Sequence, residues 1–126
     1  MHHLIRYAAG FVLLLVLSAS HAAAAQSQGD IDLSKRDMDK EALIWKQIEK
    51  VAPKAVDDFK AGTQALDNDR FQEAVAFYRR VYKLAPKDEA VNRRLGTSLA
   101  LSGQVQEAMQ FLVAAVNTKR SAAGSA

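Results

Sequence analysis

Apolar residues recur at spacings of three and four along most of the chain, which is the period of one face of a helix. The clearest example is the series Met38, Ala42, Trp45, Ile48 and Ala52. No segment alternates apolar and polar residues between turn dipeptides, as a half-buried strand would. The two prolines, Pro53 and Pro86, fall between helical periods. The pattern therefore predicts an all-α fold.

Breaks in this period divide the chain into five predicted helices. Ser34 is the expected N-cap of the first helix. The turn Asp67-Asn68-Asp69 is expected to cap the third helix, and Asp88 the fourth. Short turns between the helices predict antiparallel neighbours. The helices are expected at residues 35–51, 53–66, 70–84, 89–101 and 104–118.

The first 25 residues follow a different pattern. Arg6 precedes an apolar run of eleven residues from Tyr7 to Leu17, and small residues follow as far as Ala25. This is the order of a secretory signal, and the run is shorter than the ~20 residues that a spanning helix needs. We therefore expect residues 1–25 to be a cleaved signal peptide, residues 26–33 to be a linker, and the protein to be periplasmic or secreted. The alternative is an uncleaved membrane anchor.

Composition narrows the functions that the chain can have. Residues 26–126 keep 16 of the 17 Lys and Arg and all 14 Asp and Glu, which is too close to neutral to indicate nucleic-acid binding. The three histidines, His2, His3 and His21, all lie in the expected signal, and the chain has no cysteine. Residues 26–126 therefore lack the commonest general base, the usual zinc and copper ligands and the thiol nucleophile. We expect no enzymatic activity, no metal site and no cofactor.

Several positions repeat at an offset of 34 residues. Self-similarity at a fixed period is the sequence signature of a repeat architecture. The matching features are Gly62 with Gly96, Thr63 with Thr97, Phe71 with Val105, and Glu73-Ala74 with Glu107-Ala108.

This spacing resembles the tetratricopeptide repeat family, whose unit is a 34-residue helix–turn–helix. The residues that carry the resemblance are Gly62, Ala74, Tyr78 and Pro86 in a unit at about 55–88, and Leu95, Gly96, Ala108 and Leu112 in a unit at about 89–122. The sequence departs from the family pattern at its Trp place (Asp58, Asn92), its Tyr place (Ala65, Leu99) and its second Pro place (Arg120).

The resemblance implies a helical solenoid over residues 34–122, followed by a short tail at 123–126. It would contain about five helices, in two tetratricopeptide-like repeats plus an N-terminal packing helix. Gly62 and Ala74 would lie where two antiparallel helices approach closely, because a larger side chain would separate them.

The resemblance also implies a concave surface formed by the first helix of each pair. The residues expected to line it are Val56, Phe59, Thr63, Leu66, Arg93, Thr97 and Ala100. Phe59 as an apolar anchor and Arg93 as a charge suit an extended or helical peptide with an acidic group. Arg94 is expected to belong to a solvated charge pair. The alternative is that these residues pack on the helix at 35–51 or face solvent.

The last predicted helix has apolar residues on more than one face. Val105, Ala108, Met109, Leu112, Ala115 and Val116 form its expected inner face. Phe111 and Val113 flank that face, and they form a possible association patch or are two simply exposed residues. The sequence thus predicts an exported protein–protein interaction module without nucleic-acid partners or a membrane span after cleavage. The alternative is a self-associating structural subunit of a cell-envelope assembly.

Overall fold

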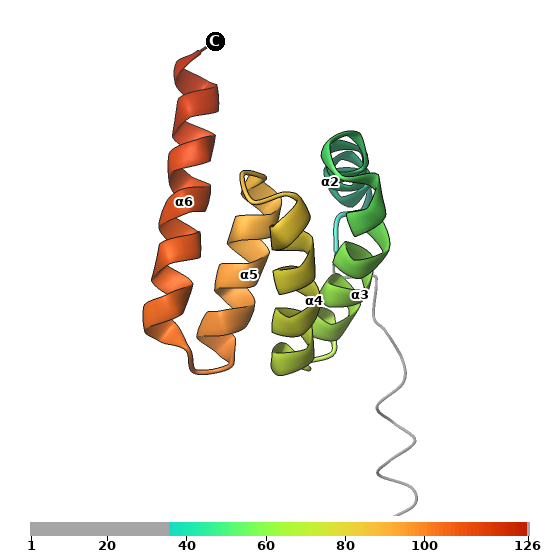
Figure 1. Cartoon of the computed structure of the whole chain (residues 1–126), viewed down its shortest axis with the longest axis vertical. Helices are drawn as coiled ribbons and strands as arrows, with labels where there is room; N and C mark the ends of the chain where they lie inside the picture. The colour runs from blue at the N-terminus through green and yellow to red at the C-terminus, as the bar shows by residue number, and fades with distance from the viewer. Residues whose placement is uncertain (1–35, 126) are drawn as a thin grey trace, which may run out of the picture. The chain divides into compact units, whose positions relative to one another are not determined.

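The computed structural model describes residues 36–125, which lie in a unit that spans Ile31–Ala126. The predicted signal, linker and Ser34 cap lie outside the described residues. Over the described range the chain is all helical, as predicted, with no strand. The elements are α2 (Met38–Val51), the 3-10 helix η3 (Pro53–Ala55), α3 (Val56–Asp67), α4 (Phe71–Leu84), α5 (Glu89–Leu101) and α6 (Val105–Gly124). Figure 1 shows α3 to α6 side by side in chain order.

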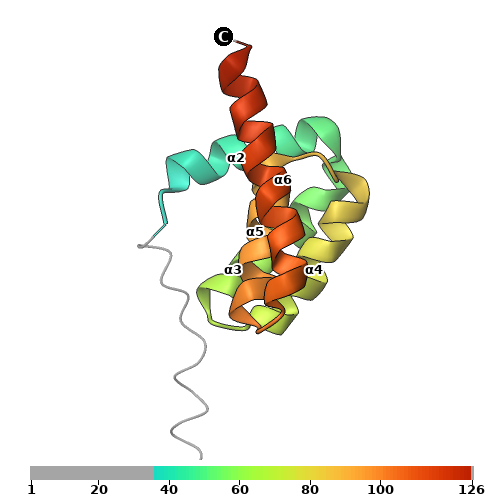
Figure 2. The ribbon, with the colours of Figure 1, turned by 90° about the vertical axis from the view of Figure 1, so that its left-hand side faces the viewer.

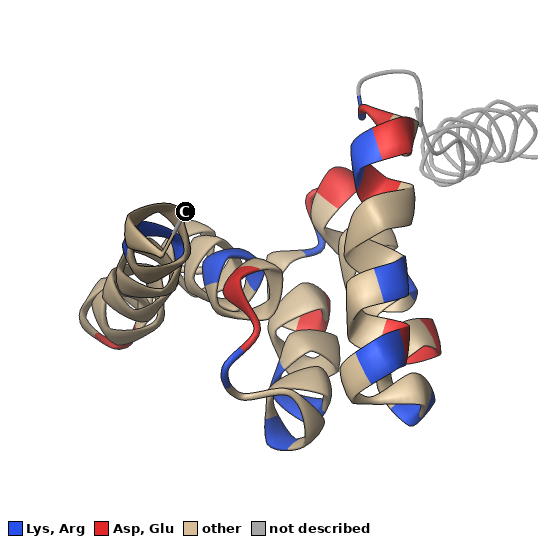
Figure 3. Cartoon of the chain, turned by 90° about the horizontal axis from the view of Figure 1, so that it is seen from above, with Lys and Arg blue, Asp and Glu red and all other residues tan. Residues whose placement is uncertain are grey.

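The first described helix, α2, begins three residues later than the sequence pattern predicts. Its N-cap is Asp37, whose carboxylate accepts a hydrogen bond from the backbone N–H of Lys40 at 3.2 Å. The helix ends before Pro53, which opens η3 and so divides the predicted helix at 53–66 into a 3-10 turn and α3. Figure 2 shows that α2 lies across the direction of the other helices, and Figure 3 shows the acidic and basic residues along it.

The two helix pairs turn in the same way. After α3, Asp69 has a φ of 58°, and the N–H of Arg70 donates to the carbonyl of Ala65 at 2.9 Å. After α5, Gly103 has a φ of 91°, and the N–H of Gln104 donates to the carbonyl of Leu99 at 2.8 Å. This is the arrangement in which a left-handed residue closes a helix C-terminus. The repeat offset of 34 residues relates each member of one turn to its counterpart in the other.

One capping prediction is wrong and another is confirmed. The N-cap of α4 is Arg70, which makes no side-chain capping bond, so the turn 67–69 does not cap this helix. Its residues close α3 instead, because Asn68 donates its side-chain N–H to the carbonyl of Gln64 at 2.9 Å. Asp88 caps α5 as predicted, accepting from the N–H of Val91 at 3.1 Å.

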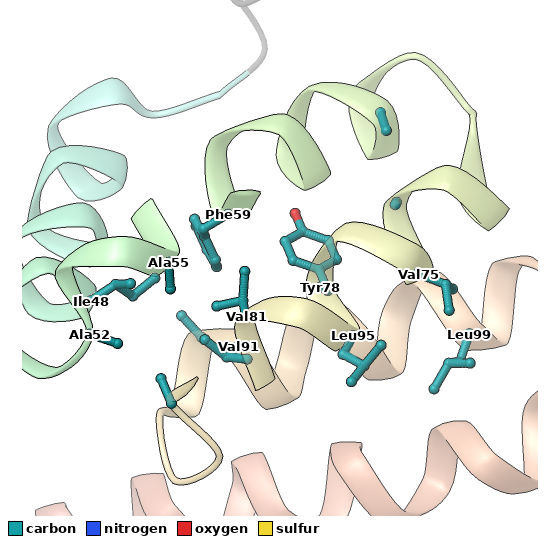
Figure 4. Packing of buried hydrophobic residues seen from close by; sticks show 14 of the residues in the cluster. Ile48, Ala52, Ala55, Phe59, Val75, Tyr78, Val81, Val91, Leu95 and Leu99 are labelled. Carbon is teal, nitrogen blue, oxygen red and sulfur yellow. The ribbon is translucent and has the colours of Figure 1, made fainter. Parts of the chain in front are cut away.

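The core lies between the paired helices, where glycine lets them approach closely. A Cβ at Gly62 would lie 2.8 Å from the Tyr78 ring, and one at Gly96 would lie 2.7 Å from Leu112. The expected close approach at Gly62 is therefore confirmed. Figure 4 shows the buried cluster, which contains Ile48, Phe59, Tyr78, Val81, Val91, Leu95 and Leu99.

The last helix, α6, is longer than predicted. Its expected range was 104–118, but it runs to Gly124 and so enters the predicted tail. Only Ala108 and Ala115 are buried on it, whereas Val105, Met109 and Val116 of the predicted inner face are exposed. The helix therefore turns a narrower face toward α5 than its sequence pattern indicates.

Candidate partner-binding site

Two residues predicted to line the partner surface are buried. Phe59 is fully buried and Thr63 is only 6% exposed. The Phe59 ring meets the Tyr78 ring at a centroid distance of 5.4 Å, and the guanidinium carbon of Arg94 lies 4.9 Å from the Phe59 centroid. The expectation that Phe59 and Thr63 line an open surface therefore does not agree with their burial, because side chains from neighbouring helices cover this face of α3.

The Thr63 hydroxyl is the centre of a buried polar cluster. It donates to the carbonyl of Phe59 at 3.0 Å, lies 2.8 Å from the Tyr78 hydroxyl, and accepts from Arg94 Nη1 at 2.7 Å. Burial raises the pKa of the Tyr78 hydroxyl, and the bond to Thr63 lowers it by a smaller amount. Polar groups removed from water are stable when they are hydrogen-bonded in this way.

A buried ion pair joins α2 to α5 across this cluster. Arg94 Nη1 donates to Glu41 Oε2 at 2.9 Å, and Arg94 Nη2 contacts Glu41 Oε1. The two side chains are 4% and 3% exposed. The prediction that Arg94 belongs to a solvated charge pair is therefore wrong. A two-pronged guanidinium–carboxylate contact of this kind fixes orientation as well as charge.

A second arginine extends the network from the chain just before α2. Arg36 Nε donates to Asp67 Oδ2 at 2.8 Å, Arg36 Nη2 contacts the other carboxylate oxygen, and Arg36 Nη1 donates to Glu41 Oε1 at 3.3 Å. The bond to Asp67 raises the pKa of Arg36 above its ordinary value, so this charge is permanent. Glu41 thus faces two arginines, and the N-terminal half of α2 is fixed over the first helix pair.

The accessible part of the predicted surface lies on α5. Val56, Leu66 and Ala100 are half-buried and pack against the core. Arg93 exposes 46% of its side chain, where it pairs with Glu89 one turn earlier at 2.9 Å. Thr97 is half-buried, and its hydroxyl donates to the Arg93 carbonyl at 2.8 Å.

Arg93 lies between two hollows. The first has a volume of about 430 Å³ and is lined by Arg36, Asp37, Lys40, Glu41, Ile44, Asp67, Arg93 and Arg94. The second has a volume of about 530 Å³ and is lined by Glu89, Arg93, Leu112, Ala115, Val116 and Lys119. Sequence reasoning did not find the contributions of α2 and α6 to these hollows, because it assigned the surface to α3 and α5 alone.

The two residues of the predicted association patch, Phe111 and Val113, differ in their exposure. Phe111 is half-buried, and its ring meets the Tyr82 ring edge-on at a centroid distance of 5.1 Å. It is therefore packed against α4, and its expected exposure is wrong. Val113 is 50% exposed.

Residues 36–125 contain no cluster of three or more acidic, histidine or cysteine residues that could hold a metal ion. Among the same residues no helix is long and apolar enough to cross a membrane.

Comparison with known proteins finds a match to one family model. Residues 65–125 match the tetratricopeptide repeat model, a segment that covers α4, the turn after it, α5 and α6. No curated protein and no solved structure matches the chain. Tetratricopeptide repeats are protein–protein interaction modules, and the paired helices with matching turns agree with this match. Residues 65–125 are therefore a tetratricopeptide repeat segment.

Proposed function

We propose that this protein is an exported interaction module that captures an acidic peptide or helix of a partner protein along the exposed side of α5. The observation that carries the proposal is the position of Arg93. Its side chain is exposed and borders both hollows, so a single partner segment that crosses it reaches both.

The charge of the first hollow favours an acidic partner. Its lining contains four basic residues against three acidic ones. Each acidic side chain already has a basic partner: Glu41 contacts Arg94, Asp67 contacts Arg36, and Asp37 contacts Lys40. Within residues 36–125, Arg93 pairs only with Glu89 on the surface, a contact worth about 0.3–0.5 kcal/mol in an exposed helix. A partner carboxylate can replace Glu89 at little cost.

The second hollow adds an apolar contact. Leu112, Ala115 and Val116 form one wall, and the charged side chains of Lys119 and Glu89 lie with it in the lining. A small number of polar groups around an apolar wall is the usual composition of a site that orients a ligand. The preferred segment would therefore carry an apolar side chain close to a carboxylate.

Export and the lack of catalysis are part of the proposal. The order of residues 1–25 supports cleavage of a signal peptide and a periplasmic or secreted location. Residues 26–126 contain neither histidine nor cysteine, which supports a function by binding rather than by chemistry.

Selection of random displayed peptides on the purified chain tests the proposal. We expect selected peptides to be enriched in Asp or Glu near a large apolar residue, and Arg93→Glu to weaken their binding at least tenfold. Arg80→Glu is the matched control, because Arg80 also forms an exposed pair, with Asp58, but lines neither hollow. Equal binding by wild type and Arg93→Glu would reject the site.

A further inference from the structure

The outer side of α6 carries an apolar stripe that no residue of the described chain covers. We define this stripe as Val105, Met109, Val113 and Val116, whose exposed fractions are 57%, 54%, 50% and 55%. Their spacings of 4, 4 and 3 residues place them on one helix face. The stripe is separate from the inner contacts of α6, which Ala108, Leu112 and Ala115 make.

The C-terminal part of α6 also lacks support within the described chain. Every residue from Val116 to Ser125 is exposed, yet the helix continues to Gly124. Short helices without tertiary contacts are marginal in water. A partner along the stripe would pack against this segment where it begins, at Val116.

From these features we propose that two copies of the protein pair through antiparallel α6 helices, with the stripe of each copy against that of the other. The spacing of the stripe residues is nearly the same from either end. A two-fold axis near the centre of the stripe therefore brings Met109 to Val113 of the partner subunit. It likewise brings Val105 to Val116 of the partner subunit. A self-complementary patch of this kind is what a two-fold dimer requires.

The charges along α6 are compatible with this pairing. Its only charged residues are Glu107, Lys119 and Arg120. Glu107 is already held by Arg79 through contacts of 2.7 and 3.0 Å, so it does not face an unpaired copy of itself. In the antiparallel pair, Arg120 lies level with the end of α5 in the second copy. That end has no basic residue in its last turn, and a helix C-terminus favours a positive charge.

A hollow at the start of α6 receives the far end of the partner's stripe. It is lined by Gly103, Gln104, Val105, Gln106, Glu107 and Gln110, and contains no basic residue. The antiparallel register places Val116 of the partner subunit at this level. The neighbouring amide side chains can hydrogen-bond at the rim of the contact without a like-charge clash.

Sedimentation velocity of residues 26–126, the chain that remains after the proposed signal cleavage, over a range of concentrations tests the dimer. We expect a concentration-dependent dimer, and we expect Met109→Lys with Val113→Lys to weaken it by roughly 100-fold, because the substitution places lysines opposite each other at the centre. Leu43→Lys is the matched control, since Leu43 of α2 is 66% exposed but lies outside the stripe. The stripe shares Val116 with the second hollow beside Arg93, but neither Met109 nor Val113 lines either hollow, so this double substitution tests the dimer without changing the lining of the partner site. Wild type that stays monomeric, or association that survives the double substitution, would overturn the proposal.

Single cysteines in this cysteine-free chain test the direction of pairing. A mixture of Met109→Cys and Val113→Cys chains should form a disulfide between copies. Val105→Cys alone should not, because antiparallel pairing separates its two copies by about 17 Å along the axis at 1.5 Å per residue. Efficient self-crosslinking of Val105→Cys would show a parallel arrangement and reject the geometry. Crosslinking to another protein in place of a second copy would identify a different occupant and reject the dimer.

Discussion

Thr63 in α3 and Thr97 in α5 lie at the same place in successive helix pairs, 34 residues apart, yet only Thr63 is buried. The same offset relates fully buried Phe59 to Arg93, whose side chain is 46% exposed. Thr63 is covered by Arg94, which Glu41 of α2 holds in place through a buried ion pair, and no described residue covers Thr97 in the same way. A repeat position therefore does not by itself define a binding residue. The accessible surface lies on α5 of the second helix pair and not on α3 of the first.

Removal of the ion pair that fixes α2 should have the largest effect. Glu41→Ala leaves Arg94 buried without its carboxylate, and we expect a loss of about 3–5 kcal/mol in the free energy of unfolding. Glu89→Ala, which removes the exposed partner of Arg93, should cost about 0.5 kcal/mol or less. Urea denaturation followed by circular dichroism measures both values. A loss below about 1 kcal/mol for Glu41→Ala would contradict the fixing role of the pair.

A combined substitution distinguishes loss of the pair from loss of packing. Glu41→Leu together with Arg94→Met removes both charges and keeps apolar bulk, so it should recover most of the lost stability. A double variant as unstable as Glu41→Ala would show that the wider hydrogen-bond cluster, and not the unpaired charge, is responsible.

The two glycines should differ in the effect of an added methyl group. At Gly62 the new Cβ meets the fully buried ring of Tyr78, and we expect Gly62→Ala to destabilise by about 2 kcal/mol. At Gly96 the new Cβ meets the half-buried side chain of Leu112 at 2.7 Å and the backbone carbonyl of Ala108 at 3.2 Å. Both variants gain about 1 kcal/mol of helix propensity, but the half-buried Leu112 side chain can shift more easily than the fully buried Tyr78 ring, so Gly96→Ala should cost less than Gly62→Ala. Thermal unfolding of the two variants checks the order, and equal losses would show that the first pair is no tighter than the second.

Tyr78→Phe should have a smaller effect with a pH signature. The lost contact with Thr63 is worth about 1 kcal/mol at neutral pH. Because burial raises the pKa of Tyr78, the hydroxyl of the unfolded chain loses its proton first as pH rises. The contribution of Tyr78 is therefore complete below pH ~10 and is lost above it. Urea titrations at neutral and high pH should show a smaller alkaline loss of stability in Tyr78→Phe than in wild type; an equal loss would assign it to other groups.

The sequence pattern predicts the helices and the repeat offset well, because both depend on local periodicity. The range 89–101, the Asp88 cap and the close approach at Gly62 all agree with the structure. The observed start of α2 has a local reason as well, since the carboxylate of its N-cap Asp37 accepts a hydrogen bond from the backbone N–H of Lys40.

The position of α2 over the first helix pair could not be predicted from hydrophobic periodicity alone. It depends on the contact between Glu41 and Arg94, which are 53 residues apart in the sequence. A signal was nevertheless present. Glu41 stands four residues before Trp45 and seven before Ile48, on the apolar face of its helix. Arg94 likewise shares the buried face of α5 with Val91 and Ser98. Opposite charges on two apolar faces indicate a buried pair, since an unpaired buried charge is unstable.

The exposed stripe on α6 was missed for a related reason. The hydrophobic periodicity predicted a single inner face that included Val105, Met109 and Val116. In the structure only the side of α6 that carries Ala108 and Ala115 is buried. Sequence spacing cannot tell a face that meets a neighbouring helix from one that meets solvent, because both are apolar.

The most direct measurement compares the chemical accessibility of the two equivalent threonines. Thr63→Cys and Thr97→Cys each introduce the only thiol into a chain without cysteine. Once melting curves confirm that both variants are folded, we predict that a thiol reagent labels Thr97→Cys roughly 100-fold faster, since Thr63→Cys must wait for local opening. Addition of Glu41→Ala should accelerate only the Thr63→Cys reaction. Equal labelling of the two cysteines in the otherwise unchanged chain would contradict the claim that α2 closes the first helix pair and leaves the second open.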